Sequence, residues 1–138
     1  MIGTFQHTID TKGRMFVPSR MRDELGNKFY VTISIDQCLQ IYTEEMWDEA
    51  IEKIRTMPQE AQMQLRPLFA CANECELDKQ GRIQLSQDLR DLVGLKKNVT
   101  IVGTGLYVQI WDADTYKPVE ESERQTENVR DAIRKFSF

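Results

Sequence analysis

Residues 10–33 read DTKGRMFVPSRMRDELGNKFYVTI, and residues 78–101 read DKQGRIQLSQDLRDLVGLKKNVTI. Aligned at an offset of 68 residues, the two stretches are identical at ten of twenty-four positions. Residues 40–42 and 109–111 continue the match, with one extra residue in the second copy. The chain therefore contains an internal duplication, and two copies predict two modules packed about a pseudo-two-fold axis rather than a solenoid.

Each copy predicts the same order of short elements. A β-rich segment leads into a turn at Gly13 or Gly81, where glycine permits a positive φ angle, and a second short strand follows. Pro18 and Ser86 then mark the start of a short helix, and Gly26 and Gly94 mark its end. A β-hairpin completes each copy. The predicted strands are residues 5–10, 14–17, 30–35 and 39–42, then 75–78, 82–85, 99–102 and 106–111, with hairpin turns at 36–37 and 103–105.

Helices are expected between the copies and after them. Thr43 can cap a helix that Pro58 ends, and a second helix over residues 59–70 is expected to be disturbed at Pro67. A last helical region opens at Asp112 or Asp114, and its few apolar residues suit a mobile tail or a contact with a neighbouring subunit. The expected division is module 1 at 5–47, a helical connector at 48–73, module 2 at 74–117 and a helical tail at 118–138.

The composition is that of a cytoplasmic protein with one ordinary core. The 138 residues are 41% apolar and 29% charged, and no apolar run approaches the roughly 18 residues that cross a bilayer. The first residues resemble no signal peptide. Cys38, Cys71 and Cys75 lack the spacing of a metal site, so we expect three small buried residues, with no metal and no cofactor.

The net charge of -4 argues by itself against nucleic acid, because phosphate contacts need lysine and arginine. The charges are unevenly placed, however. Residues 10–28 and 78–97 each carry five basic against three acidic residues, whereas residues 36–60 carry two basic against seven acidic residues. Two weakly basic segments thus lie among acidic helices, and charge alone favours ordinary solvated surface there.

The twin Asp-x-x-x-Arg strings at residues 10–14 and 78–82 resemble the motifs of the MraZ family, as do residues 17–20, 76–83 and 109–112. The match covers essentially the whole chain in order. Two such motifs 68 residues apart, each followed by the same helix and hairpin, are highly specific. The chain departs from the family pattern at Ser86, where a second proline is common, and at Asp88, which stands opposite the basic Arg20 of the first copy.

The resemblance implies an α+β fold in which two tandem AbrB-like modules form one pseudo-symmetric barrel of the swapped-hairpin type, with added helices. It implies a transcription regulator that forms a homo-oligomeric ring and associates with the nucleoid. The regulator is expected to bind double-stranded DNA at direct repeats upstream of the division and cell-wall gene cluster. It is expected to act as a repressor whose targets include its own operon. Neither a membrane nor a small-molecule substrate is expected as a partner.

The resemblance also places the Asp-x-x-x-Arg loops on the surface that faces DNA. Arginine after a turn glycine can reach a base edge or a phosphate, or it can instead pair with its own aspartate and pin the turn. For the two helix arginines, a packed structural role is the alternative. The expected DNA-binding residues are Lys12, Arg14, Arg20, Arg22, Lys79, Arg82 and Arg90, and the structural motif residues are Asp10, Gly13, Asp78 and Gly81.

Catalysis finds no support in the sequence, because no phosphate loop, nucleophile elbow or metal-ligand cluster is present. The single histidine, His7, is expected on the surface or in a cross-strand pair, and the aromatic residues near the hairpins are expected in the core. The alternative function is an oligomeric protein-interaction scaffold whose basic loops are only structural.

Overall fold

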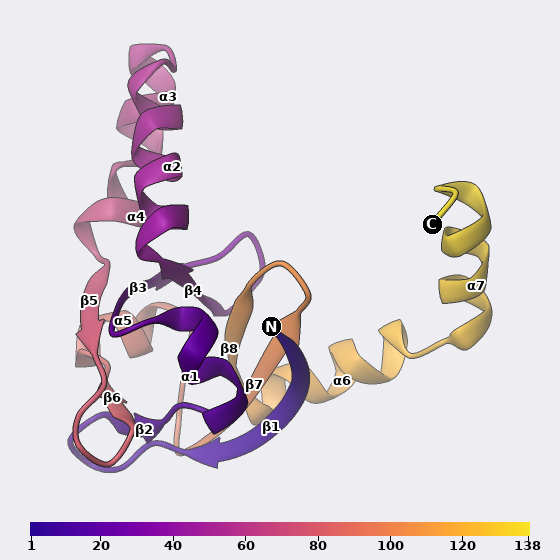
Figure 1. Ribbon diagram of the computed structural model, residues 1–138, viewed down its shortest axis with the longest axis horizontal. Helices are drawn as coiled ribbons and strands as arrows, with labels where there is room; N and C mark the ends of the chain where they lie inside the picture. The colour runs from indigo at the N-terminus through magenta and orange to yellow at the C-terminus, as the bar shows by residue number, and fades with distance from the viewer.

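The computed structural model describes all 138 residues, and Figure 1 shows a β-rich body from which two helical arms project. The strands are β1 (Ile2–Thr8), β2 (Arg14–Phe16), β3 (Lys28–Ile33), β4 (Leu39–Thr43), β5 (Asn73–Glu76), β6 (Arg82–Gln84), β7 (Asn98–Thr104) and β8 (Val108–Asp112). The helices are α1 (Ser19–Leu25), α2 (Glu44–Arg55), α3 (Gln59–Gln64), α4 (Arg66–Ala70), α5 (Gln87–Leu92), α6 (Ala113–Glu123) and α7 (Thr126–Lys135).

Six strands form one antiparallel sheet in the order β1-β7-β8-β4-β3-β5, and β2 pairs with β6 in a separate two-stranded ribbon. The first strand of each copy pairs with the hairpin of the other copy, β1 with β7 and β5 with β3. The two hairpins meet where β4 pairs with β8. Exchanging the copies leaves this order unchanged, so the pseudo-two-fold axis passes between β4 and β8 and through the ribbon.

The expected barrel does not close. Strands β1 and β5 stand at the two ends of the sheet and do not pair with each other. Where pairing of β1 with β5 would have closed the barrel, the β2–β6 ribbon covers the core instead. The central residues of the ribbon, Met15 and Ile83, are almost fully buried. The α+β class and the tandem copies agree with the sequence prediction, and the closed barrel was wrong.

Both copies contribute to one hydrophobic core. Equivalent apolar side chains from the two copies are buried together, and burying apolar surface of this kind is the main favourable contribution to folding. The buried pairs are Met15/Ile83, Val17/Leu85, Met21/Leu89, Val31/Val99 and Ile41/Ile110. Since each copy also completes the other copy's sheet, the two copies depend on one another for their fold.

The predicted helix signals are mostly confirmed. The Ser86 hydroxyl accepts a hydrogen bond from the Leu89 N–H at the start of α5, and the Thr43 hydroxyl accepts one from the Met46 N–H at the start of α2. Asp112 caps α6 through the Thr115 N–H. These side chains satisfy backbone N–H groups that have no partner within the helix.

Two local predictions were wrong, and a third was confirmed only in part. Pro58 does not end α2, which stops at Arg55, but precedes α3. The helix expected over residues 59–70 is disturbed, as expected from Pro67, but it is interrupted at Leu65 and forms two helices. Pro67 lies in the first turn of α4, where its missing N–H does no harm. The turn expected at 103–105 lies later, since Gly103 and Thr104 continue β7 opposite β1.

Five of the seven helices form two arms that leave the body in different directions, whereas α1 and α5 pack on the body (Figure 1). Helices α2, α3 and α4 fold into a hairpin anchored by Trp47, which stacks on Tyr30 at 4.6 Å between ring centroids and packs on Phe69 at 5.2 Å. Helices α6 and α7 extend from the other side of the sheet, and every residue from 121 to 138 is exposed. None of the seven helices is long and apolar enough to span a membrane.

The cysteines are three free thiols. Cys38 and Cys75 are buried, as expected, and burial raises the pKa of both thiols to about 12. Cys71 is only half-buried, because it lies at the end of α4 on the margin of the core. A thiol with a raised pKa holds little thiolate at neutral pH and is a poor nucleophile.

Candidate nucleic-acid interface

The candidate interface is the β2–β6 ribbon with the loop that precedes each of its strands. The ribbon pairs Arg14 with Gln84 and Phe16 with Arg82. Alternation along a strand turns Met15 and Ile83 into the core and these four side chains outward. The Val17 N–H donates to the Gly81 carbonyl at 3.0 Å, and the Leu85 N–H donates to the Gly13 carbonyl at 2.8 Å. The ribbon therefore holds the two motif loops in fixed positions relative to each other.

Asp10 organises the first loop. One oxygen of its carboxylate accepts hydrogen bonds from the backbone N–H groups of Lys12 and Arg14, both at 2.9 Å, and the other accepts from Arg14 Nε at 2.7 Å. The Arg14 backbone N–H is the largest of the causes that lower the pKa of the Asp10 carboxyl. The aspartate thus closes the turn and fixes the start of the arginine side chain at the same time.

The second loop repeats this geometry with different intervening residues. Asp78 accepts from the backbone N–H groups of Gln80 and Arg82 at 2.9 Å and from Arg82 Nε at 2.9 Å. The Arg82 backbone N–H is again the main cause that lowers the pKa of the aspartate. Residues 10–19 and 78–87 differ at seven of their ten positions. The two copies nevertheless form the same loop around the shared Asp, Gly and Arg.

The terminal guanidinium nitrogens of both motif arginines, Arg14 and Arg82, are free to bind another group. Each uses Nε for its aspartate, which leaves the terminal Nη1 and Nη2 groups for an external acceptor. Their side chains are 34% exposed for Arg14 and 21% exposed for Arg82. A planar guanidinium fixed at one edge can bind a phosphate or the O6/N7 edge of guanine in a forked geometry.

Arg22 and Arg90 pack across the pseudo-two-fold axis. Arg22 Nε donates to the Val17 carbonyl at 2.9 Å, and Arg90 Nε donates to the Leu85 carbonyl at 3.2 Å. The guanidinium of Arg22 lies directly over Gly81, and that of Arg90 lies over Gly13. Each helix arginine therefore covers the glycine of the opposite copy's motif, where a β-carbon would collide with it.

The remaining predicted cations differ between the copies. Lys12 and Lys79 are exposed in the motif loops, but they occupy different positions of those loops. Arg20 is exposed on α1, and the equivalent position on α5 holds Asp88. His7 lies on β1 opposite Val99, and its burial, together with the charge of Arg22, lowers its pKa. The ribbon thus has one cation-rich flank beside α1.

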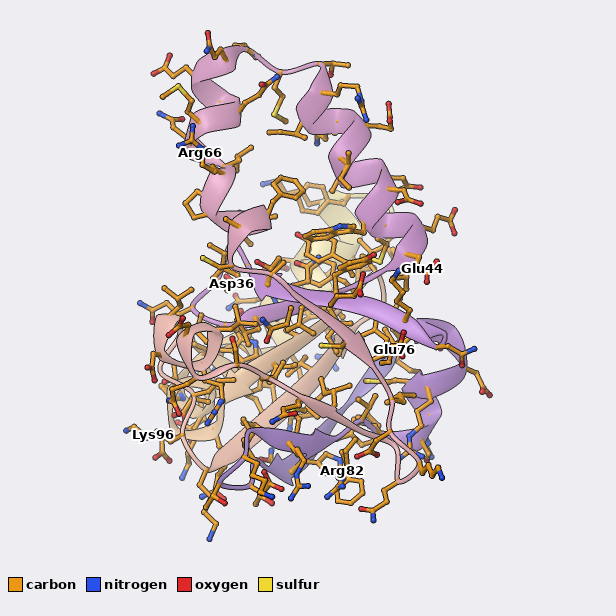
Figure 2. All side chains as sticks on the ribbon, turned by 90° about the vertical axis from the view of Figure 1, so that its left-hand side faces the viewer. Asp36, Glu44, Arg66, Glu76, Arg82 and Lys96 are labelled. Atoms are coloured by element: carbon orange, nitrogen blue, oxygen red, sulfur yellow. The ribbon has the colours of Figure 1, made fainter.

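The basic and acidic parts of the chain are separated in space. The ribbon lies at the end of the body away from the α2–α3 hairpin in Figure 1, and Figure 2 shows Arg82 at one end of the molecule with Glu44 and Arg66 toward the other. The acidic side chains of α2 are exposed at that other end. The net charge of -4 therefore does not describe the surface around the ribbon.

Comparison with known families decides the identity of this arrangement. A family model described as "MraZ protein, putative antitoxin-like" matches residues 1–66 and again residues 68–137. The chain belongs to the MraZ family. The two matches divide the chain as the internal repeat does, although the strands of each part complete the sheet of the other.

Membership of the MraZ family gives the function at a coarse level. The family is regulator-like rather than enzymatic, and this indicates a DNA-binding regulator. The two Asp-x-x-x-Arg loops that suggested the family are the loops at the ends of the ribbon. The motifs of the family and the geometry of the ribbon therefore identify the same surface as the candidate interface.

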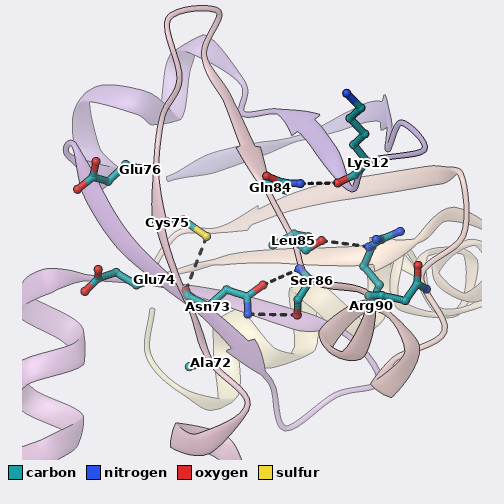
Figure 3. A pocket seen from close by; sticks show the side chains of 11 residues that line it. Lys12, Ala72, Asn73, Glu74, Cys75, Glu76, Gln84, Leu85, Ser86 and Arg90 are labelled. Atoms are coloured by element: carbon teal, nitrogen blue, oxygen red, sulfur yellow. Dashed lines mark hydrogen bonds between the residues drawn. The ribbon is translucent and has the colours of Figure 1, made fainter.

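Three residues of this surface were not among the functional residues predicted from the sequence. Phe16 and Gln84 point outward on the ribbon, which strict alternation over residues 14–17 and 82–85 could have shown. Asn73 binds Ser86, accepting from its N–H at 2.8 Å and donating to its hydroxyl at 3.2 Å (Figure 3). Pro18, at the equivalent position of the first copy, has no N–H, so the first copy cannot form the bond that the Ser86 N–H makes with Asn73.

A polar groove runs beside β6 (Figure 3). It has a volume of about 670 Å³ and is lined by residues of β5, β6, α5 and the first motif loop. Within it the Gln84 amide donates to the Lys12 carbonyl at 2.8 Å, and the Arg90 guanidinium reaches the Leu85 carbonyl. The groove belongs to the same surface as the ribbon and extends it on the side of the second copy.

Proposed function

We propose that this chain is a sequence-selective transcription regulator that binds direct repeats in double-stranded DNA upstream of the division and cell-wall gene cluster. We propose further that it acts as a repressor, that its own operon is among its targets, and that it associates with the nucleoid. The observation that carries the proposal is the β2–β6 ribbon, at whose ends two aspartate-held arginines present free guanidinium forks.

The ribbon has the shape that direct readout requires. The major groove of B-DNA is about 12 Å wide and admits a two-stranded β-ribbon. With the ribbon in the groove, Arg14 and Arg82 would reach base edges or phosphates from opposite ends. Asp10 and Asp78 would hold both arginines in their bound conformation beforehand, which reduces the ordering cost of binding.

The other cations would supply phosphate contacts and support. Lys12, Lys79 and Arg20 are exposed beside the ribbon and suit phosphates. Arg22 and Arg90 are partly buried and bound to backbone carbonyls, so we assign them to holding the loops, with any DNA contact secondary. Gly13 and Gly81 leave the space that these two arginines fill.

We also propose that the chain assembles into a closed homo-oligomeric ring. The positive charge around one ribbon is small, so several ribbons must bind together for high affinity. Helix α7 offers a contact surface, because Val129, Ile133 and Phe136 are 50%, 44% and 71% exposed. Light scattering at micromolar concentration should give a mass greater than a dimer, and a monomer would contradict the ring.

One observation favours a second function, that of a protein-interaction scaffold. Arg14 and Arg82 already have acidic partners in their own loops. Three exposed apolar side chains, Val129, Ile133 and Phe136, lie on or directly after α7, away from the ribbon. In that case the basic loops would be structural and the chain would bind protein alone.

Genome-wide mapping of DNA cross-linked to the protein in cells distinguishes the two functions. A regulator should enrich a few fragments that carry direct repeats, and the Arg14→Ala variant should lose most of that enrichment. Arg55→Ala is the matched control, because Arg55 is an exposed arginine on α2 that also pairs with an acid, Glu52. Equal enrichment of all genomic DNA, or none, would contradict a sequence-selective regulator.

A further inference from the structure

The ribbon is symmetric in its backbone and asymmetric in its side chains. Exchange of the two copies places Arg14 on Arg82 and Phe16 on Gln84. The two arginines are therefore equivalent, whereas the other two outward positions carry an aromatic ring and an amide. A two-fold DNA site would meet the same arginine on both sides, but a different residue beside it.

The two unlike residues are held by different contacts. The guanidinium of Arg82 lies 5.9 Å from the centre of the Phe16 ring, and the Phe16 side chain remains 44% exposed. Gln84 instead donates through Nε2 to the Lys12 carbonyl, which leaves Oε1 as a free acceptor. One corner of the ribbon is thus apolar and the other is a fixed hydrogen-bonding group.

The surfaces beside Phe16 and beside Gln84 also differ in their charged residues. Beside Phe16 lies a groove of about 450 Å³ that includes the exposed Arg20. Beside Gln84 lies the larger polar groove. The position equivalent to Arg20 is Asp88, which is exposed on α5 and does not line this groove. A phosphate would be attracted more strongly on the first flank, where Arg20 and Arg22 line the groove with no acid, than on the second, where Glu74 and Glu76 offset Lys12 and Arg90.

We infer that the ribbon binds DNA in one orientation only, and that Phe16 and Gln84 determine that orientation. The inference rests on the proposed DNA binding and adds a polarity to it. A phenyl ring suits contact with the methyl group of thymine, whereas a glutamine amide suits a base edge with hydrogen-bonding groups, such as that of adenine. Arg20 and Asp88 act in the same direction through the phosphates.

Polarity has a consequence for the arrangement of sites. A two-fold symmetric reader prefers a palindrome, because both halves make the same contacts. A ribbon with Phe16 at one corner and Gln84 at the other prefers a site in which two equivalent arginine contacts enclose unlike bases. Copies of such a reader presented side by side by rotational symmetry would bind sites that all point the same way.

Selection from a random duplex library tests this inference. The wild-type chain should enrich a non-palindromic site with a preference of about tenfold at the base beside Phe16, in line with the discrimination of a single side-chain contact. The Phe16→Gln variant makes the four outward positions of the ribbon identical in the two copies, so its enriched site should become closer to a palindrome. The Gln84→Phe variant should do the same with the other base preference.

Met63→Gln is the matched control, because Met63 is 55% exposed on α3, far from the ribbon, and should leave the enriched site unchanged. Urea denaturation should show that each variant still unfolds cooperatively, since Phe16 and Gln84 lie at the surface and not in the core. A palindromic wild-type site, or the same asymmetric site from both ribbon variants, would overturn the inference while leaving DNA binding intact. Failure of the wild-type chain to enrich any sequence would overturn the proposed function as well.

Discussion

At the scale of single residues, the motif aspartates perform two tasks at once. Asp10 accepts two backbone N–H groups and one guanidinium N–H, and Asp78 does the same in the second copy. The backbone bonds close a turn around a glycine, and the side-chain bond directs the arginine outward. The pairing of each arginine with its own aspartate is therefore compatible with DNA contact, since only Nε is occupied.

Replacement of Arg14 by alanine should weaken DNA binding by about 1–3 kcal/mol, because a forked contact to a base edge is lost. Folding should be nearly intact, since exposed ion pairs contribute little to stability. Fluorescence anisotropy with a labelled repeat fragment measures the affinity, and urea denaturation measures stability. Unchanged affinity in a folded variant would remove Arg14 from the interface, and loss of folding would show that the pair with Asp10 is structural.

The pKa of Asp10 makes the first motif loop sensitive to acid. Its folded pKa is lowered below the ordinary value, so its contribution to stability is present above that value and is lost as the pH falls through the folded pKa. In an NMR titration, the amide signals of Lys12 and Arg14 should shift with a midpoint below that of a free aspartate. The Asp10→Asn variant should abolish this shift and keep the corresponding one at Gln80 and Arg82. A midpoint at or above the ordinary value would contradict the hydrogen-bonded carboxylate.

At the scale of elements, the two motif loops hold each other. The Gly13 carbonyl accepts from Leu85, and the guanidinium of Arg90 lies over the same glycine. The φ angle of Gly13 is 81°. Both a left-handed backbone and a close approach by the opposite copy therefore require glycine at this position.

Gly13→Ala should consequently destabilise the fold more than Gly94→Ala. Both glycines have a positive φ, 81° and 66°, but a β-carbon at Gly94 would meet nothing within 4 Å. The difference should be about 1–3 kcal/mol, the usual cost of forcing an extra carbon into a packed site. Urea denaturation of the two variants measures it. Equal free energies of unfolding would show that the contact across the ribbon contributes nothing.

The sequence predicted the order of elements within each copy well, because turn glycines, caps and apolar alternation are local signals. Ser86 and Thr43 cap the helices as expected. The crossing of Arg22 onto Gly81 and of Arg90 onto Gly13 could not be predicted in this way, since it depends on how the two copies pack. The open ends of the sheet at β1 and β5 have the same origin, because strand closure is decided by long-range geometry.

At the scale of the whole molecule, charge is divided between its ends. The ribbon and its cations lie at one end, and the acidic α2 projects from the other (Figures 1 and 2). Such a division orients the chain toward a polyanion with the acidic α2 directed away. The basic segments 10–28 and 78–97 each exceed their acids by only two residues, so a single ribbon should bind weakly.

The central claim is that this chain is a DNA-binding regulator whose ribbons bind several repeats at once. Tethered ribbons gain affinity without new contacts, by a factor of about 10²–10⁴, when all repeats lie on one face of the duplex. The decisive measurement is a titration, at fixed salt, of fragments with one repeat, with three repeats spaced by about 10–10.5 base pairs, and with half a turn inserted between them. We predict tight binding to the three-repeat fragment, weak binding to the single repeat, a sharp loss on half-turn insertion and partial recovery when a full turn is restored. The claim would be contradicted if a single-repeat fragment or a scrambled fragment bound as tightly as the three-repeat fragment.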